Sequence, residues 1–561
     1  MVGAERSPES PRGWWRDAVV YQVYLRSFAD GNGDGQGDIA GLRARLPYLA
    51  ELGVDALWLT PWYRSPMADG GYDIADYREI DPVFGTLAEA ELLVAEAREY
   101  GLRLIVDIVP NHLSHEHPLF RAALTAPAGS PEREVFHFRS GRGESGEEPP
   151  NNWRSEFGGP AWTRTTDADG KPGEWYLHLF CPEQPDVNWA NPLVRSEFDS
   201  VLRFWFDRGV AGVRVDSASL LEKDAHLPDL VRSGGPHPYV DREELHDVYR
   251  SWRRTAETYS EERLLVGEIW LDDNERLARY LRHDELHAAF NFAFLKCAWE
   301  HAELTAVIET SLATSRRTGA PATWVLCNHD VTRTVTRYGR QDTSFDFGSV
   351  AAGVPSDLSL GTRRARAAAL LTLALPGSVY LYQGEELGLP EVEDLPPGSR
   401  RDPVHFRSGG SDPGRDGCRV PMPWSGEAPP YGFSGGGDET WLPQPDGWAG
   451  YAASAQDTDA DSMLNLYRRA VRLRNSLPCL RSDAFDWVPA GAEVLAFRRE
   501  DFLCMVNFSG RPVSLPPGHA VLTASDTSTG NVLAPHGAVW LRRDRTASGP
   551  TRIPSGHTPG T

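Results

Sequence analysis

Acidic side chains stand at the ends of short apolar segments in this 561-residue chain, and they are its strongest candidates for chemistry. Asp216 ends the segment VAGVRVD, Glu268 follows LLVG, and Asp330 follows ATWVLCNH. A carboxylate inside such a segment is unfavourable unless it is paired or used. One alone would more often form a structural ion pair, but several on successive segments indicate an active site.

Other polar residues occupy the same kind of position. They lie at the ends of the third, fourth, seventh and eighth apolar segments: Asp107, Asn111, His112, Arg214, His329, Glu385 and Glu386. Their recurrence at successive segment ends favours one shared site over a set of isolated ion pairs.

The fold must bring these segment ends together. Eight apolar, β-branched segments alternate with longer helix-like stretches such as LAEAELLVAEAREYG. Near-continuous apolar strands fit burial on both faces, and the alternation predicts an α/β fold of the (β/α)8 TIM-barrel type. The predicted strands begin at Ala18, Ala56, Leu102, Val210, Leu264, Ala288, Ala322 and Ser378. In such a barrel the strand C-termini converge on one mouth, where active sites lie.

Two intervals break the alternation and divide the chain. A stretch rich in Gly, Pro and Glu predicts a small inserted domain after the third strand, and a long loop after the eighth strand predicts a site rim. Short alternating segments near the C-terminus predict an antiparallel β-sandwich domain, followed by a disordered tail. The predicted ranges are 1–112 and 184–476 for the barrel, 113–183 for the inserted domain, 477–545 for the β domain and 546–561 for the tail.

Six motifs follow one another along the chain: DIVPNH (107–112), QPDVNW (184–189), GVRVDSAS (212–219), GEIW (267–270), NHDVTR (328–333) and YQGEELG (382–388). With these motifs the sequence resembles the α-amylase family of glycoside hydrolases, glycoside hydrolase family 13, and within it the α-glucosidase and oligo-1,6-glucosidase branch. The motifs stand in the family's order across almost the whole chain. One such match would carry little weight, whereas six in register are specific.

The resemblance implies roles for the three carboxylates. Asp216 matches the family's nucleophile, Glu268 its general acid/base, and Asp330 a third carboxylate that binds sugar hydroxyls and supports the transition state. Retaining cleavage of an α-glucosidic bond needs such a nucleophile and acid about 5 Å apart. Arg214 faces the same side of its strand as Asp216 and would keep it ionised. Glu268 needs burial or a like charge to hold its proton near neutral pH.

Five further residues match the family's substrate-binding groups. His112 and His329 match paired imidazoles that hydrogen-bond the sugar at the cleavage subsite. Tyr72 and Asp73, in GGYDIADY, match an aromatic platform and a carboxylate that hold the non-reducing terminal glucose. Arg415, in GRDGCRVPMPW, matches the arginine partner of that carboxylate, and the pair would close the pocket and make the enzyme exo-acting. This segment reads RVPMPW where the family usually has RTPMQW, which leaves the geometry of the loop open.

A separate motif repeats the pattern of a cation-binding loop. Oxygen-bearing residues alternate with glycines in DGNGDGQGD: Asp30, Asn32, Asp34, Gln36 and Asp38. The spacing matches EF-hand positions 1, 3, 5, 7 and 9, the seventh through a backbone carbonyl, although the closing Glu is absent. The family often carries Ca²⁺ or Mg²⁺ on the loop after the first strand, so one structural ion is expected, and no organic cofactor. The alternative is a solvated turn without an ion.

Composition limits the partners and the compartment. The net charge of −22 repels phosphate backbones and anionic lipids, which disfavours a nucleic-acid or membrane binder. The N-terminus lacks the apolar region of a signal peptide, and no run of 18 uncharged apolar residues would span a membrane. The six cysteines form no C-x-x-C pair and no metal-ligand spacing, so reduced thiols in a cytoplasmic protein are expected.

These inferences predict a retaining, exo-acting α-glucosidase that releases terminal α-glucose from maltose-like disaccharides and short α-glucans. Ser217, which follows Asp216, favours α-1,4 bonds, because family members that prefer α-1,6 bonds tend to carry Val there. A transglucosidase, a sugar isomerase and an α-1,6-specific enzyme remain alternatives, although IWLDDNERL lacks the EANQWP-like continuation of trehalose synthases. A non-catalytic glucan-binding relative would have lost an acid, and all three are present. The expected partner is a small oligosaccharide, and the expected state is a monomer or homodimer.

Overall fold

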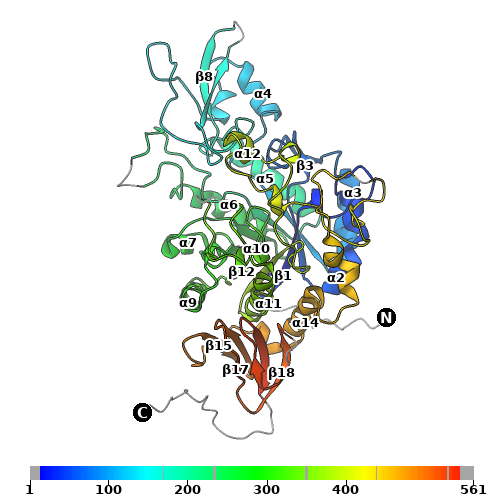
Figure 1. Cartoon of the computed structure of the whole chain (residues 1–561). Helices are drawn as coiled ribbons and strands as arrows, with labels where there is room; N and C mark the ends of the chain where they lie inside the picture. The colour runs from blue at the N-terminus through cyan, green and yellow to red at the C-terminus, as the bar shows by residue number, and fades with distance from the viewer. Residues whose placement is uncertain are drawn as a thin grey trace.

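The structure is a computed structural model that describes residues 13–167, 170–231, 236–347, 352–437, 439–526 and 530–543 (Figure 1). A barrel stands in the middle of the molecule, with a small inserted sheet at one end and the C-terminal β domain at the other. The tail predicted at 546–561 lies outside the described residues.

Eight parallel strands form the barrel, one at each predicted place. They are β1 (Val19–Val23), β2 (Ala56–Leu59), β5 (Arg103–Ile108), β9 (Gly212–Val215), β10 (Leu264–Gly267), β11 (Ala288–Ala289), β12 (Thr323–Val325) and β13 (Ser378–Tyr382). These strands pair in chain order, and β13 pairs with β1. The N–H of Asn291, after β11, donates to the carbonyl oxygen of Thr323 in β12 at 3.0 Å, which completes the ring. The predicted (β/α)8 barrel is confirmed.

Helices surround the strands. They are α1 (Ile39–Ala44), α2 (Leu46–Leu52), α3 (Leu87–Glu99), α5 (Pro192–Asp207), α6 (Leu245–Glu257), α7 (Asn274–Tyr280), α8 (Phe292–Lys296), α9 (His301–Thr318), α10 (Thr334–Tyr338), α11 (Leu358–Ala374), α13 (Ala453–Asp457) and α14 (Met463–Ser476). The two predicted long helices begin at side-chain caps: Thr86 and Glu89 form a capping box at α3, and Asn191 caps α5. Apolar residues at helical spacing, such as Phe198 and Trp205 on α5, are buried.

An insertion between β5 and β9 forms the small sheet. It contains α4 (Pro118–Thr125), β6 (Phe138–Arg139), β7 (Trp162–Thr166) and β8 (Pro172–Leu177), with antiparallel strand order β6-β8-β7. Trp153, Trp162 and Leu177 pack in one apolar core with Leu227 and Tyr239 from the loop after β9. The inserted domain is therefore completed by residues outside 113–183.

The long loop after β13 reaches the insertion. It carries the short helix α12 (Pro403–Arg407), which lies beside the inserted sheet in Figure 1. Nε of Arg407 donates to the carbonyl oxygen of Gly158 at 3.0 Å. The insertion and this loop therefore meet at the same end of the barrel and flank its mouth.

The C-terminal domain is an antiparallel sheet of order β14-β15-β16-β20-β18 with a separate pair β17-β19. Its strands are β14 (Asp486–Trp487), β15 (Val494–Arg499), β16 (Phe502–Asn507), β17 (Val513–Ser514), β18 (His519–Ala524), β19 (Val532–Leu533) and β20 (Ala538–Arg543). Trp540 and Arg499 donate to backbone carbonyls of α11, those of Leu370 and Ala374, at 2.9 and 2.8 Å. The predicted antiparallel β domain is confirmed, and it packs against the barrel.

In the part of the chain that the structure describes, no helix has both the length and the apolar character that crossing a bilayer requires. The six cysteines are all buried, and none of them forms a disulfide in the structure. Burial raises the pKa of the Cys327 thiol to about 12, so this thiol stays protonated at neutral pH.

Candidate active site

One buried arginine holds three carboxylates at the barrel mouth. Nη1 of Arg214 donates to Oδ1 of Asp107 at 2.8 Å and to Oδ1 of Asp216 at 2.6 Å. Its Nη2 lies 2.7 Å from Oε2 of Glu268. Asp107 lies in β5 and Arg214 in β9, while Asp216 directly follows β9 and Glu268 directly follows β10. The structure thus brings the predicted nucleophile and the predicted acid onto two nitrogens of one guanidinium, which is only 1% exposed.

The two carboxylates differ in acidity in the order that their predicted roles require. Burial raises the pKa of Glu268 to about 7, and the neighbouring charges of Asp216 and Asp330 add to this rise. Burial also raises the pKa of Asp216 to about 6, although Arg214 acts in the opposite direction. The arginine therefore limits the rise for Asp216 but does not bring its pKa below the ordinary value. At pH 7 Asp216 is mostly ionised, whereas Glu268 is about half protonated.

Two N–H groups orient Glu268. The backbone N–H of Ser217 donates to Oε2 at 2.8 Å, and Nε1 of Trp270 donates to Oε1 at 3.0 Å. Ser217 has a φ of 45°, in the left-handed region that few non-glycine residues adopt. This turn directly after Asp216 places the Ser217 N–H against the acid, so the same residue links the two candidate catalytic carboxylates.

Two arginines and a histidine surround the carboxylate of Asp330. Its Oδ1 accepts from Nη1 of Arg415 at 3.0 Å and from Nη2 of Arg419 at 2.9 Å, and its Oδ2 lies 3.3 Å from Nε2 of His329. Burial acts to raise the pKa of Asp330, but the neighbouring arginine charges outweigh it and hold the pKa below its ordinary value. Asp330 is therefore ionised at neutral pH. Sequence reasoning missed Arg419, although it is the first residue of the RVPMPW segment.

Tyr72 and His329 form a stacked pair between Asp107, which is bound by Arg214, and Asp330. Their ring centroids lie 5.4 Å apart with an interplanar angle of 5°. The Tyr72 hydroxyl lies 2.8 Å from Nε2 of His329 and donates to Oδ2 of Asp107 at 3.1 Å. Nε2 of Gln22, a residue that the sequence did not single out, lies 2.7 Å from Nδ1 of His329. Burial keeps the pKa of His329 well below its ordinary value, so the ring is neutral.

His112 lies on the side of the site that faces the insertion. Its Nε2 lies 3.0 Å from the amide nitrogen of Gln184 and 3.2 Å from the carbonyl oxygen of Tyr72. Burial lowers the pKa of His112 to about 4, which makes it a neutral hydrogen-bonding group at physiological pH. Gln184 belongs to the QPDVNW motif and also donates to Oδ2 of Asp69 at 3.2 Å.

The predicted pair of Arg415 with Asp73 is wrong. Nη2 of Arg415 donates instead to Oδ1 of Asp69 at 2.8 Å, and its Nε donates to Oδ2 of Asp402 at 2.7 Å. Asp73 is fully buried, and its carboxylate accepts from the Ser65 hydroxyl at 2.9 Å and from the backbone N–H groups of residues 68 and 69. Asp73 therefore shapes the turn that carries Asp69. Asp69 stands three residues before Tyr72, and this short spacing is the sequence signal for its place in the site.

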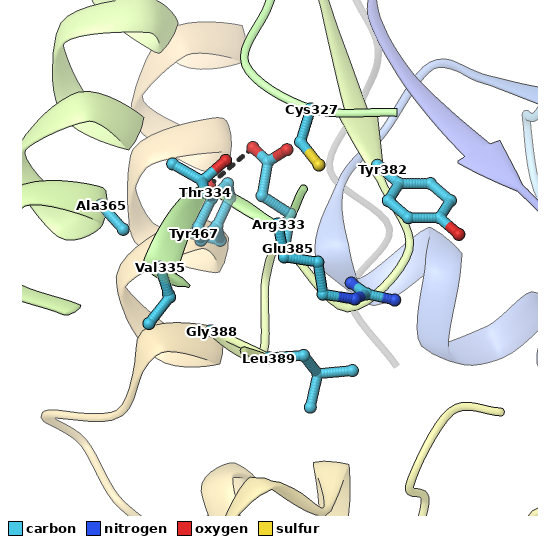
Figure 2. A pocket seen from close by; sticks show the side chains of 10 residues that line it. All are labelled: Cys327, Arg333, Thr334, Val335, Ala365, Tyr382, Glu385, Gly388, Leu389 and Tyr467. Carbon is cyan, nitrogen blue, oxygen red and sulfur yellow. Dashed lines mark hydrogen bonds between the residues drawn. The ribbon is translucent and has the colours of Figure 1, made fainter. Parts of the chain in front are cut away.

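Glu385 and Glu386 do not join the site, contrary to the expectation from their place after the eighth strand. Glu386 accepts from the hydroxyls of Tyr21 and Tyr48 at 2.7 and 2.8 Å. Glu385 accepts from the Tyr467 hydroxyl at 2.9 Å and lines a small internal cavity (Figure 2). Burial raises the pKa of Glu385 to about 8, so the carboxyl group is protonated there. The chain turns after β13, which sends both side chains toward the helices.

The glycine-rich loop after β1 brings two carboxylates together. The backbone N–H of Asn32 lies 3.1 Å from Oδ1 of Asp30 and equally far from Oδ2 of Asp38. Burial raises the pKa of Asp38, and the charge of Asp30 adds to this rise. Among the residues that the structure describes, no basic side chain pairs with either carboxylate within 4 Å. Backbone N–H groups of the loop donate to both carboxylates and offset part of their charge. A bound cation would offset more of it.

The remaining oxygens of the loop fit the EF-hand-like pattern in part. Nε of Arg26 donates to the side-chain oxygen of Gln36 at 2.8 Å, which leaves the Gln36 backbone carbonyl as the ligand expected at position 7. Within the described chain, no three acidic, histidine or cysteine side chains gather as a ready metal site. A cation here would thus require amide and backbone oxygens as ligands, which Ca²⁺ and Mg²⁺ accept.

Comparison with known proteins agrees with the geometry. The family described as "Alpha amylase, catalytic domain" matches residues 22–483. The trehalose-6-phosphate hydrolase of Escherichia coli strain K12 is 35% identical over 519 residues, covering 87% of this chain and 88% of the hydrolase. A probable alpha-glucosidase of Rhizobium meliloti strain 1021 is 35% identical over 530 residues, covering 89% and 90%. The solved structure of the alpha-glucosyl transfer enzyme XgtA is 34% identical, with a TM-score of 0.80 over 95% of this chain and 100% of XgtA.

Proposed function

The chain belongs to the α-amylase family of glycoside hydrolases, and on this premise we propose that it is a retaining, exo-acting α-glucosidase. It releases terminal α-glucose from maltose-like disaccharides and short α-glucans. The observation that carries the proposal is the arrangement around Arg214, which places an ionised Asp216 and a partly protonated Glu268 on one guanidinium. The relationship to a probable alpha-glucosidase supports the substrate class.

The mechanism follows from these two protonation states. A carboxylate oxygen of Asp216 attacks C1 of the glucose while Glu268 donates its proton to the departing glycosidic oxygen, so that a glucosyl–aspartate ester forms and the aglycone leaves as an alcohol. Glu268, now ionised, takes a proton from a water molecule, which attacks C1 and releases Asp216. The two inversions at C1 return α-glucose. Asp330, ionised among its arginines, would bind sugar hydroxyls and stabilise the positive charge that develops on the ring.

The exo action is assigned to the pair of Arg415 and Asp69. Together with Asp330 they would grip the hydroxyls of a terminal glucose and leave no passage for a longer chain. The guanidinium of Arg415 lies 4.8 Å above the ring of Phe157, which comes from the insertion. The insertion therefore supports the closed end of the pocket.

Two further observations bear on which glycosidic linkage is cleaved and on which acceptor takes the glucose. Ser217 favours α-1,4 over α-1,6 bonds, as inferred from the sequence. A transglucosidase is the second candidate, supported by the likeness to the alpha-glucosyl transfer enzyme XgtA. In that case a sugar or another alcohol would replace water in the second step, with the same role for Glu268.

We also infer one structural Ca²⁺ or Mg²⁺ on the loop from Asp30 to Asp38, a cytoplasmic location and a monomeric or dimeric state. The crowded carboxylates of Asp30 and Asp38 support the ion. Removal of metal by EDTA should lower Tm, and added Ca²⁺ or Mg²⁺ should restore it. Metal analysis of the purified protein that finds no divalent ion, with no effect of EDTA, would contradict this assignment. The unpaired cysteines support the compartment.

Product analysis by NMR tests the proposed function. With maltose as substrate, the α-anomer of glucose should appear first, before mutarotation produces the β-anomer. Initial release of β-glucose would exclude a retaining enzyme. Faster cleavage of isomaltose than maltose would move the preference to α-1,6 bonds, and longer sugars or trehalose at constant total glycoside would favour the transferase or isomerase alternative. No turnover of any α-glucoside would overturn the proposal.

A further inference from the structure

A cavity of about 300 Å³ lies where the barrel meets the C-terminal β domain, and we call it the junction cavity. Helix α11 packs there against α14 and against strands β16 and β20 (Figure 1). None of the residues that line it belongs to the active site at the barrel mouth. Its volume is at the lower end of the range for small-molecule sites. The lining includes Arg363 and Arg366 of α11, Asp461 before α14, Ser525 and Asp526 after β18, and His536 before β20.

Two arginines on one face of α11 supply positive charge to the junction cavity. Arg363 and Arg366 are three residues apart, so their side chains are neighbours on the helix surface. Nη1 of Arg363 donates to the Ser359 hydroxyl at 3.1 Å, and Nε of Arg366 donates to the carbonyl oxygen of Ser525 at 2.7 Å. Among the residues that the structure describes, no carboxylate oxygen lies within 4 Å of either guanidinium. Each guanidinium therefore contacts neutral oxygens rather than an anion.

A third cation increases the positive charge around Arg366. Burial lowers the pKa of Arg366, and the charge of Arg469 on α14 adds to the decrease. The carboxylates of Asp526, Asp461 and Asp459 act in the opposite direction from beyond ion-pair distance. Arginine stays charged in proteins, so this half-buried guanidinium lies near another cation without a directly bound anion. An anionic ligand in the cavity would supply a charge-assisted hydrogen bond.

His536 adds a neutral polar group to the lining. Burial lowers the pKa of His536, and the charges of Arg364 and Arg363 add to the decrease, so the ring is uncharged at physiological pH. Its Nδ1 is buried and has no hydrogen-bond partner in the described part of the chain. A neutral imidazole still carries one N–H donor. The ring can therefore donate to an anion without changing the charge of the cavity.

The junction cavity offers cations and carboxylates together. A phosphate ester carries about −2 charge near neutral pH, which matches the two guanidinium groups of Arg363 and Arg366, and arginine binds phosphate oxygens in pairs. The carboxylates of Asp461 and Asp526 would repel a second anionic group, but they accept hydrogen bonds from hydroxyls. We propose that the junction cavity binds a phosphate ester that also carries hydroxyl groups, of the class of phosphorylated monosaccharides. This site is additional to the proposed α-glucosidase site, and no bond is made or broken in it.

Isothermal titration calorimetry with glucose 6-phosphate tests the site. Excess glucose is present in every titration, so that the proposed glucose pocket is already occupied. The wild-type protein should bind glucose 6-phosphate saturably and inorganic phosphate more weakly, because inorganic phosphate has no sugar hydroxyls for the aspartates. Arg363→Gln should lower the affinity for glucose 6-phosphate by about 10- to 100-fold, the range of one charge-assisted hydrogen bond, and leave kcat/KM with maltose unchanged. Arg366→Gln should have the same effect and provides a second variant.

Arg316→Gln is the matched control. Arg316 is exposed in the last turn of α9 and does not line the junction cavity, so this variant has the same change in net charge away from the site. It should retain the wild-type affinity. No binding of glucose 6-phosphate to the wild type, or unchanged affinity in folded Arg363 and Arg366 variants, would overturn the junction cavity as a binding site. Equal affinity for inorganic phosphate and glucose 6-phosphate would overturn the recognition of hydroxyls. Glucose release from maltose is measured separately, so failure of this proposal and failure of the α-glucosidase are distinguishable.

Discussion

Two regions of the barrel bury carboxyl groups, in contrasting surroundings. At the mouth, Glu268 and its neighbours are held by the guanidinium of Arg214. Behind β13, Glu385 is held by the Tyr467 hydroxyl, and its second oxygen has no hydrogen-bond partner in the described part of the chain. Arg333 also lines that cavity, but its guanidinium donates to backbone carbonyls, at 2.9 and 2.7 Å, rather than to the carboxyl group (Figure 2).

The difference teaches that a raised pKa does not by itself identify a catalytic acid. Burial is the largest cause in both regions, and it raises the pKa of Glu268 to about 7 and that of Glu385 to about 8. Glu268 and the carboxylate beside it, Asp216, share one guanidinium, and an N–H network orients Glu268. Glu386, the carboxylate whose charge acts on Glu385, is held instead by tyrosine hydroxyls. A perturbed pKa becomes a functional signal when geometry supplies a second reacting group.

The largest expected effect is a loss of activity on substitution at the barrel mouth. Asp216→Asn should lower kcat by about 10⁴-fold or more, because the covalent step loses its nucleophile. Circular dichroism should show an unchanged fold. Rescue by azide of the smaller variant Asp216→Gly, with formation of a β-glucosyl azide, would identify the attacked face. Residual activity within tenfold of wild type would mean that another group is the nucleophile.

The next effect concerns the pH profile. In the wild type, kcat/KM should fall below a pH of about 6 as Asp216 takes a proton and above about 7 as Glu268 loses its proton, the two apparent values belonging to the coupled pair. Glu268→Gln should lower kcat by roughly 10²- to 10⁴-fold and remove the fall at high pH. Persistence of that alkaline fall in the variant would assign it to another group.

A smaller effect should distinguish two neighbouring aspartates. Asp69→Asn weakens the pair with Arg415 and should lower kcat/KM by about 10- to 100-fold with little change in stability. Asp73→Asn replaces an acceptor with a donor that faces backbone N–H groups, so the free energy of unfolding should fall by roughly 1–3 kcal/mol. Denaturant titration and steady-state kinetics of both variants provide the comparison. A loss of kcat/KM in Asp73→Asn together with a loss of stability in Asp69→Asn would show that Asp73 is the residue that binds substrate.

The smallest effect on activity is expected at Glu385. Glu385→Gln should leave kcat/KM within about twofold, because the carboxyl group lies outside the site. Its pKa is raised from 4.5 to about 8 in the fold, so the folded protein holds a proton that the unfolded chain releases. Wild-type stability should therefore fall, relative to the variant, by about 1.4 kcal/mol per pH unit between the two values. Parallel stability curves of wild type and variant from pH 5 to pH 8 would contradict a protonated Glu385.

Much of the fold could be predicted because barrel strands are short, apolar on both faces and regularly spaced. All eight strands lie where the segments from Ala18 to Ser378 predicted them. The contribution of the loop after β9 to the inserted core could not be predicted, because Leu227 and Tyr239 show no period and meet Trp153 only in three dimensions.

The candidate site could be predicted where a residue sits at a strand end, as Asp216 and Glu268 do. The prediction of the site was less accurate where the conformation of a loop determines which side chains meet. Asp69 and Asp73 are both acidic and both near Tyr72, and the turn between them determines which one reaches Arg415. Glu385 shows the converse error, since a polar residue after a strand points away from the mouth when the backbone turns early.

The sequence by itself determined the barrel, the three carboxylates and the order in which the strands present them, because strand spacing and residue type are local properties. The tertiary structure alone decided which charges meet: Arg214 with Asp107, Asp216 and Glu268, Arg415 with Asp69, and Trp270 with Glu268. Electrostatic energy depends on the distance between groups and on their exclusion from water. Both quantities arise only when segments distant in the chain pack together.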